Sequence, residues 1–532
     1  MFESPRSRSA APVALLVALL AGALQAASTA WPFVMPPSLA VLGLMRGNTV
    51  WWLQVLSMAT LVNLLMRAPN ARQSAWRGWL FTLTWLAATF AWLFTSMHTY
   101  GGLPAPLAVL AVLALAGALA IYYAAACWVF WPLALMNKAL AAIVFASLWL
   151  LAELARGQWL TGFGWGAVGY AQLDGPLQPL IPWIGMYGVS WVAAVVAGLL
   201  AAALTAPTLK NKGLAAIALL ALLVLPLALP VTEGADQGEL SVTLLQGNIA
   251  QEEKFEPATG VIKALRWYGE QLQTSSSSLI ITPETALAVL PEQLPDGYWR
   301  ALQQRFATGQ QAALVGLPLG SLAEGYTNSV IGFKPGQAAP WRYDKHHLVP
   351  FGEFIPPMFR WFTDLMHIPL GDFSRGGLPQ PTFDWQGQRL AATVCYENLY
   401  SNELATQFVD AAKAPTILAN ISNLGWFGEH LAMDQHLQIA RMRSLEYDRP
   451  FLLATNTGHT AIVNRLGEII DAAPPHTTTA LQGVVQGRTG LTPYARWMSQ
   501  FGLWPLWLLA LAVVVLAGLL RKPQRRPHLH AF

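Results

Sequence analysis

Apolar positions dominate the first 230 residues, where long hydrophobic runs are separated by short polar turns. An α-helix needs about twenty apolar residues to cross the hydrocarbon core of a bilayer. The pattern predicts eight such spans, at residues 11–28, 49–66, 78–98, 106–130, 139–155, 184–206, 213–231 and 502–520. The first run also resembles a signal peptide, but further spans follow at once, which favours a retained helix.

One apolar run does not fit a span. Residues 30–45 are interrupted by Pro32, Pro36 and Pro37, and proline disrupts the interior of a helix. We therefore interpret this segment as an interfacial loop.

Between residues 240 and 490 the pattern changes to short β-rich runs that alternate with helical stretches. The predicted strands are 240–246, 278–282, 312–317, 328–333, 389–394, 416–421, 451–455 and 460–463, and the predicted helices include 257–274, 297–308, 402–413 and 430–447. This alternation is typical of a layered α/β domain in which helices cover sheets. We therefore predict a membrane domain at 1–232, a catalytic-type domain at 233–498, and a last span with a basic tail at 499–532.

Composition and charge support this division. The chain is 54% hydrophobic and 11% charged, whereas soluble domains carry about 25% charged residues. With 30–45 left out of the span count, most basic loop residues fall on one side of the membrane. Those on the majority side are Arg6, Arg8, Arg67, Arg72, Arg77, Lys138, Lys210, Lys212 and the tail, against Arg46 and Arg156 on the other. Because cytoplasmic loops carry the excess of Lys and Arg, both termini are expected in the cytoplasm and the α/β domain outside it.

Several classes of function are disfavoured. The net charge of +4 is too small to indicate nucleic-acid binding. Cys127 lies in an apolar run and Cys395 in the α/β domain, so no disulfide framework is expected. No phosphate-binding glycine loop occurs, and the adjacent His346 and His347 do not share a face, so we predict neither a metal nor a cofactor.

Three polar segments stand at predicted strand ends. Pro283-Glu284 follows the second strand, Lys345 begins a segment that ends at Glu353, and Cys395-Tyr396-Glu397 follows the fifth strand. A thiol needs a base to remove its proton, and a cation stabilises the negative charge that then develops. Each residue also has a plainer interpretation, because loop glutamates are usually solvated and free cysteines usually pack in cores.

In this order, the three segments resemble the Glu-Lys-Cys triad of the nitrilase superfamily. Together with the predicted spans, they make the chain similar to the apolipoprotein N-acyltransferase family. Supporting stretches are 160–163, 170–175, 246–249, 420–428 and 490–496. One departure is Asn423-Leu424, where the family often has Asn-Asp.

The resemblance implies a fold, a set of residue roles and a reaction. The fold would be an eight-span helical bundle carrying an extracytoplasmic α-β-β-α sandwich. Cys395 would be the nucleophile, Glu284 the general base and acid, and Lys345 the oxyanion cation, with supporting roles for Glu353, Tyr396 and Glu397. The reaction would move an acyl chain from a phospholipid to Cys395, and then to the α-amine of a diacylglyceryl-cysteine apolipoprotein, on the periplasmic side of a bacterial inner membrane.

Aromatic residues near these segments are candidates for substrate binding. Residues 354–370 form an apolar, proline-broken stretch, and we expect Trp361 and Phe362 to guide acyl chains from the membrane interface, with Trp426 and Phe427 opposite. The loop 156–183, which contains Trp165, is either the floor of the site or a glycine-rich turn between helices. The plainer alternative for 354–370 is a helix packed on its own domain.

Two other functions remain open. A membrane-anchored amidase or nitrile hydrolase would use the same triad with water as the acceptor. A transporter is disfavoured, because transporters bury functional charges in their spans and Glu153 is the sole acidic residue within a predicted one.

Overall fold

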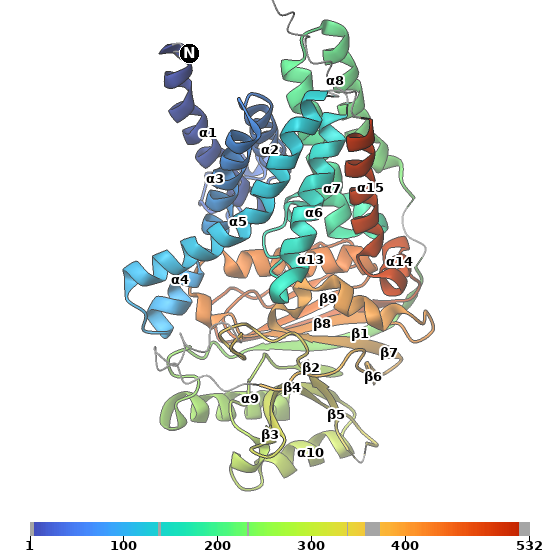
Figure 1. Ribbon diagram of the computed structural model, residues 1–532. Coiled ribbons are helices and arrows are strands. Elements are labelled where there is room, and N and C mark those ends of the chain that lie inside the picture. The colour runs from blue at the N-terminus through green and yellow to red at the C-terminus, as the bar shows by residue number, and fades with distance from the viewer. Residues whose placement is uncertain (1–4, 137–139, 231–233, 338, 357–372, 521–532) are drawn as a thin grey trace, which may run out of the picture.

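The computed structural model describes residues 5–136, 140–230, 234–337, 339–356 and 373–520. It consists of a bundle of apolar helices and, below it, a domain built on two β-sheets (Figure 1). The start of α1 (Pro5–Thr29) and the end of α15 (Trp504–Leu519) both lie at the end of the bundle away from the sheets.

The bundle contains an element at every predicted span. They are α1, α2 (Trp51–Met66), α3 (Ala71–Thr89) with α4 (Leu93–Thr95) and η2 (Ser96–Tyr100), α5 (Ala105–Met136), α6 (Ala141–Gln158), α7 (Ile181–Thr205), α8 (Leu209–Val224) and α15. Within the described residues five helices are long and apolar enough to cross a membrane, and two bent pairs raise the number to seven. The helix α2 is apolar but shorter. Several apolar helices are therefore present, while the count of eight spans stays a prediction.

The segment predicted as an interfacial loop forms no long helix. It contains one 3-10 turn, η1 (Pro37–Leu42). Phe33, Val34 and Val41 expose most of their surface. At its end Arg46 donates to the carbonyl of Glu429 in the sheet domain. The segment therefore forms no spanning helix, and its interfacial position stays a prediction.

The domain holds two six-stranded sheets, in the orders β12-β1-β2-β3-β4-β5 and β11-β10-β9-β8-β7-β6. The strands are β1 (Asp236–Gln246), β2 (Leu279–Ile281), β3 (Ala312–Ser321), β4 (Gly325–Phe333), β5 (Trp341–Asp344), β6 (Phe383–Trp385), β7 (Gln388–Val394), β8 (Ile417–Ser422), β9 (Phe451–Thr455), β10 (Ala461–Val463), β11 (Ile469–Ala472) and β12 (Thr479–Arg488). In each sheet three neighbouring strands are parallel, β1-β2-β3 and β7-β8-β9, and the others pair antiparallel. The two sheets thus share one pairing pattern, which brings the ends of their parallel strands to a common edge.

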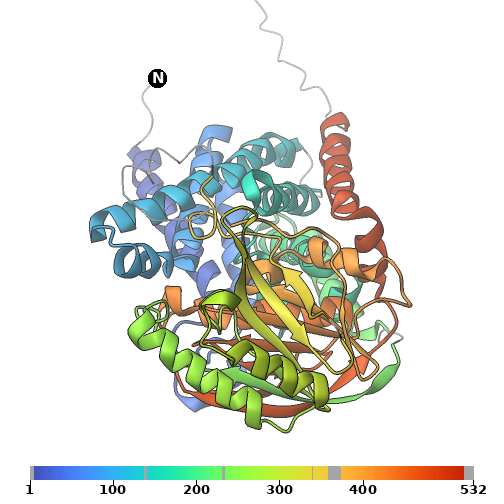
Figure 2. The same ribbon diagram turned by 90° about the horizontal axis from the view of Figure 1, so that it is seen from below.

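Helices cover both outer faces of the sheet pair. The helices α9 (Ile262–Thr274) and α10 (Tyr298–Thr308) cover the first sheet, as the view from below shows (Figure 2). The helix α13 (Ala432–Tyr447) lies between the second sheet and the bundle (Figure 1). The predicted layered α/β architecture is thereby confirmed as two helix-covered sheets.

The helix α13 is also the main polar link between the two parts. Its Arg441 pairs with Asp174 at the bundle, and Glu446 accepts a hydrogen bond from the backbone N–H of Met186 at 2.8 Å. Gln435 Oε1 accepts from the indole N–H groups of Trp92 at 3.1 Å and Trp165 at 2.7 Å. The contacts of Gln435 and Glu446 are buried, so the bundle fixes the orientation of α13 and of the sheet beneath it.

All eight predicted strands occur, and four others were missed. The missed strands are β5, β6, β11 and β12. The predicted helix 402–413 is wrong in its second half, because α12 (Ser401–Leu404) and η11 (Ala405–Phe408) end at 408. Of the predicted domain boundaries, 232–233 lies outside the described residues and 498–499 falls within α14 (Pro493–Phe501).

Candidate functional site

Cys395 stands at the end of β7, on the turn that leads into η10 (Cys395–Leu399). Its φ of 56° lies in the left-handed region, which is costly for a residue with a Cβ and occurs mainly where the surroundings enforce it. Asn420 donates to the Cys395 carbonyl at 2.8 Å, and His436 Nε2 lies 3.4 Å from the same oxygen. The residue is 7% exposed, so the turn presents a nearly buried cysteine at the sheet edge.

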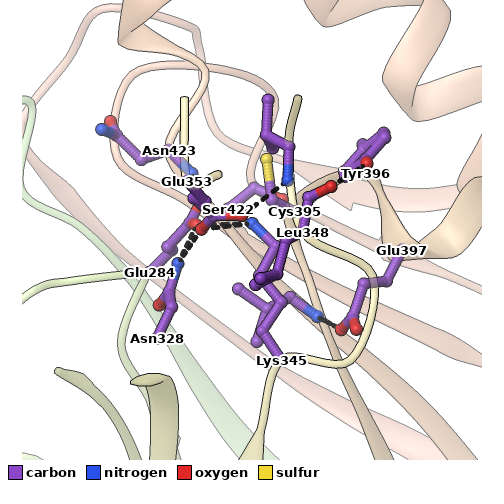
Figure 3. A network of polar contacts seen from close by, with 12 residues as sticks. Glu284, Asn328, Lys345, Leu348, Glu353, Cys395, Tyr396, Glu397, Ser422 and Asn423 are labelled. Atoms are coloured by element: carbon purple, nitrogen blue, oxygen red, sulfur yellow. Dashed lines mark hydrogen bonds and ion pairs between the residues drawn. The ribbon is translucent and has the colours of Figure 1, made fainter. Parts of the chain in front are cut away.

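Glu284, Lys345 and Glu353 meet beside Cys395 (Figure 3). Lys345 Nζ lies 3.2 Å from Glu284 Oε1 and 2.9 Å from Glu353 Oε1. The side-chain amide of Asn328, on β4, donates to both carboxylates at 2.7 Å. All four side chains are buried, so one ammonium and one amide hold two carboxylates in place with almost no water.

The remaining oxygens of the two carboxylates are bound by the backbone. The N–H of Asn423 donates to Glu284 Oε2 at 2.8 Å, and that of Val349 donates to Glu353 Oε2 at 2.8 Å. Because their lone pairs are occupied, neither carboxylate can rotate freely. The site is therefore organised before any substrate arrives.

Electrostatics assign different protonation states to the thiol and to its neighbours. Burial, and next the charge of Glu284, raise the pKa of Cys395 well above its ordinary value, while Lys345 acts in the opposite direction. Burial alone would raise the pKa of Glu284, but the charges of Lys345 and Lys254 and the bonds from Asn328 and Asn423 outweigh it and hold it low. Burial would lower the pKa of Lys345, but Glu284 and Glu353 raise it. At neutral pH the site therefore holds a protonated thiol, an ionised Glu284 and an ammonium.

Glu397 braces the segment that carries Lys345. Its carboxylate accepts from the backbone N–H groups of His346, His347 and Val394, at 2.7, 2.9 and 2.6 Å. The hydroxyl of Tyr343 adds a fourth bond at 2.9 Å. Burial raises the pKa of Glu397 to about 7, against the effect of these donors. The adjacent Tyr396 donates to the carbonyl of Leu348 at 2.6 Å, so Tyr396 and Glu397 both tie η10 to the 343–349 segment.

The structure thus brings together all six residues predicted for catalysis, from segments that are distant in the sequence. Sequence analysis missed Asn328 and the carbonyl contacts of Asn420 and His436. The only signal for Asn328 was a polar residue at the start of an otherwise apolar strand. Position 424, where the family pattern is broken, is a buried leucine.

The aromatic residues predicted to bind substrate differ in position and in burial. Trp361 and Phe362 lie outside the described residues. Phe427 is partly buried against Trp92, with ring centroids 4.4 Å apart, and Trp426 is 39% exposed beside Tyr100 and Phe255. Trp165 is buried between Trp92 and α13. Its substrate role stays a prediction, and its packing alone accounts for its position.

Among the described residues, no group of three His, Cys, Asp or Glu side chains is arranged to hold a metal ion. The site itself brings together a thiol, two carboxylates and an ammonium. This combination is suited to covalent acyl chemistry through a sulfur nucleophile.

Comparison with known proteins finds a matching family for each of the two parts of the chain. Residues 241–494 match the carbon-nitrogen hydrolase family, which defines the class to which the sheet domain belongs. Residues 38–199 match the apolipoprotein N-acyltransferase N-terminal domain.

Whole-chain relatives extend this match. Apolipoprotein N-acyltransferase from Verminephrobacter eiseniae is 50% identical over 91% of this chain and 92% of its own, and that from Ralstonia nicotianae is 43% identical over 86% and 89%. The crystal structure of Saccharomyces cerevisiae Nit3, a member of branch 10 of the nitrilase superfamily, has a TM-score of 0.35 and 15% identity over 47% of this chain and 90% of that chain. The chain belongs to the apolipoprotein N-acyltransferase family.

Proposed function

We propose that this protein N-acylates the N-terminal diacylglyceryl-cysteine of apolipoproteins with an acyl chain taken from a membrane phospholipid. The observation that carries the proposal is a buried thiol, carboxylate and ammonium set in a domain that is fixed directly to a bundle of apolar helices. Such a site can receive a lipid without passing it through water. The whole-chain relatives carry the name of this activity.

The first half of the reaction acylates Cys395. Glu284 takes the thiol proton while the sulfur attacks the ester carbonyl of the phospholipid, because the thiol is protonated at rest and the carboxylate is ionised. Lys345 stabilises the tetrahedral oxyanion. The carbon–oxygen bond then breaks, Glu284 returns its proton to the leaving alcohol, and a lysophospholipid departs from the thioester.

The second half transfers the acyl chain to nitrogen. The neutral α-amine of the diacylglyceryl-cysteine attacks the thioester carbonyl, and Lys345 again faces the oxyanion. The carbon–sulfur bond breaks, Glu284 accepts the proton of the new amide nitrogen and returns it to the Cys395 thiolate. A buried site favours the amine because it limits the access of competing water.

The arrangement of the helices and the positions of the basic loops support a proposal for the setting of this reaction. We place the protein in a bacterial inner membrane, with eight spans, the sheet domain on the periplasmic side and both termini in the cytoplasm. Cytoplasmic loops carry an excess of Lys and Arg, and the start of α8, with the exposed Lys210 and the half-buried Lys212, lies at the bundle end opposite the sheets. Phospholipid and apolipoprotein would both reach the domain from the outer leaflet.

Intact-mass analysis tests the proposal against the hydrolase alternative. Purified protein incubated with phospholipid in mixed micelles is expected to gain one fatty-acyl mass, located at Cys395 by peptide mapping. Addition of a diacylglyceryl-cysteinyl peptide should discharge the adduct, whereas the same peptide with an acetylated amine should not. Equal loss of the adduct in buffer alone would identify water as the acceptor and favour the membrane-anchored amidase or nitrile hydrolase.

A further inference from the structure

Lys254 is a buried lysine beside Glu284 that the reaction above does not use. It lies in the loop after β1 and is 3% exposed. Its Nζ donates to the main-chain carbonyl of Glu284 at 2.9 Å. Within the described part of the chain, no carboxylate oxygen forms an ion pair with this ammonium. A buried charge without a direct counterion is costly, and such costs are concentrated at functional sites.

The charge of the buried cluster explains why a second cation is needed. Glu284 and Glu353 share the single ammonium of Lys345, which leaves one negative charge in excess. Two carboxylates this close disfavour each other's ionisation, so one of them would tend to hold a proton. A protonated Glu284 cannot accept the proton of Cys395. The ammonium of Lys254 brings the cluster of two carboxylates and two lysines to zero net charge.

The loop of Lys254 reaches Glu284 by a second route. Gln251 accepts a hydrogen bond from the side-chain amide of Asn423 at 2.8 Å. The backbone N–H of Asn423 binds Glu284 Oε2 at 2.8 Å. The loop therefore contacts the main chain of Glu284 directly and its carboxylate through Asn423, which fixes the base on both sides.

The pKa of Lys254 depends on the charged groups around it. Those that act on it are Glu284, in the turn after β2, and Cys395, at the end of β7. Glu252, Glu253 and Glu256 of its own loop are exposed. Burial lowers the pKa of Lys254 to about 8, and Glu284 and Cys395 act in the opposite direction. Its charge is therefore present at neutral pH, where it acts on Glu284 together with Lys345.

We propose that Lys254 is a positioning residue that fixes Glu284 and supplies the second positive charge that keeps Glu284 ionised beside Glu353. It thereby sets the lowest pH at which Cys395 is activated. The inference rests on the proposed function only in taking Cys395 as the nucleophile and Glu284 as its base.

The pH dependence of Cys395 alkylation by iodoacetamide tests this role without any lipid. The full chain carries Cys127→Ala, and the second-order rate constant is measured from about pH 5 to 9, where the acid limb reports the ionisation of Glu284. Lys254→Met should move the acid limb upward by about one pH unit or more, because an opposite charge near a carboxyl lowers its pKa by about 1–3 units. At pH values below the wild-type acid limb, each pH unit of this shift makes the alkylation of Cys395 about tenfold slower. Lys254→Arg, which keeps the charge, and Lys263→Met, on the exposed side of α9, should leave the limb in place.

Two outcomes would overturn the proposal. If Lys254→Met lowers the rate by one factor at every pH, with the limb unmoved, Lys254 has only a structural role. If this variant does not fold, infrared difference spectroscopy of the Cys127→Ala protein decides instead. A protonated-carboxyl band at pH 7 that disappears in Glu284→Gln would contradict the proposal, and its absence would support it. The two proposals can fail separately. If the unsubstituted protein forms no acyl adduct, while Lys254→Met still shifts the acid limb of alkylation as expected, the proposed function is refuted and the role of Lys254 is supported.

Discussion

At the scale of single residues, the backbone of Cys395 is the most informative feature. A left-handed conformation at a residue with a Cβ costs about 1–3 kcal/mol, and Asn420 and His436 hold the carbonyl that this conformation turns inward. In this turn Cys395 lies beside Glu284, Glu353 and Lys345 (Figure 3). The strain therefore places the thiol where a base and a cation already lie.

Replacement of the two cysteines separates this role from ordinary packing. Cys395→Ala should abolish acyl transfer and the acyl adduct, since no other thiol lies at the triad. Cys127→Ala should retain both, because Cys127 is a buried residue of α5 that packs against α3 at Gly78. The adduct is measured by intact mass, and transfer by the mass of the acceptor peptide. Activity retained in Cys395→Ala but lost in Cys127→Ala would refute the assignment.

Glu284→Gln tests the base. The amide cannot accept the thiol proton, and its NH₂ group would meet either the Asn423 N–H or the Lys345 and Asn328 donors that the carboxylate now accepts. We expect the rate of Cys395 acylation to fall by about a hundredfold or more. The rate is measured in single-turnover experiments by quenched-flow mass analysis. Glu292→Gln, at an exposed site in the same segment, should acylate normally, and a wild-type rate in Glu284→Gln would exclude the base role.

Glu397→Gln tests the brace between η10 and the Lys345 segment. Four donors converge on the carboxylate, and an amide can accept from only part of them. A buried donor left unpaired costs about 1–3 kcal/mol, so the melting temperature should fall and acylation should slow as Lys345 loses its position. Thermal unfolding followed by tryptophan fluorescence gives the first quantity and single-turnover acylation the second. Unchanged values of both would show that Glu397 is dispensable.

The sequence identified the triad because each member stands in a short segment with a chemical signature. It did not identify Asn328 or Lys254, whose roles depend on which strand ends meet. Asn328 begins the strand predicted at 328–333, and Lys254 lies between glutamates that are exposed. Only the pairing of β2 with β3 and of β3 with β4, and the position of the loop after β1, bring these two residues to Glu284.

At the scale of elements, burial decided which strands were predictable. The parallel strands β2, β8 and β9 are buried at every position and read as apolar runs, as expected for strands covered on both faces. The strand β11 is exposed at all four positions, β6 has three residues, and β12 carries two glutamines and a glycine at partly exposed positions. These strands pair with neighbouring strands but have no apolar or alternating sequence pattern of their own. Sequence analysis therefore missed them.

The docking of α13 on the bundle can be tested through Gln435. Its side-chain oxygen accepts from two buried indoles, and Gln435→Leu leaves both N–H groups without this acceptor. At about 1–3 kcal/mol for each unpaired donor, the melting temperature in detergent should fall by several degrees. Gln273→Leu, at an exposed position of α9, is the matched control. Equal melting temperatures for the two variants would show that the indoles contribute nothing to docking.

At the scale of the whole molecule, the parallel strands of both sheets end at one edge and the bundle fixes that edge in place. Glu284 follows β2 in the first sheet, whereas Cys395 and Asn423 follow β7 and β8 in the second. The site therefore exists only when both sheets are packed together. Because α13 backs the second sheet and contacts the bundle, the distance from the thiol to the apolar helices is set by rigid elements rather than by a linker.

Orientation in the membrane is the last property that the whole molecule determines. Glu324, in the turn between β3 and β4, is exposed on the sheet domain, and Lys210, at the start of α8, is exposed at the opposite end of the bundle. We expect Glu324→Cys to react with an impermeant maleimide applied to intact spheroplasts, and Lys210→Cys to react only after permeabilisation, because basic loops stay in the cytoplasm. Both variants carry Cys127→Ala and Cys395→Ala so that the introduced thiol is the sole target, and labelling is measured by gel shift. Labelling of Lys210→Cys in intact spheroplasts, with Glu324→Cys protected, would place the triad in the cytoplasm, away from the outer leaflet that the proposed reaction requires.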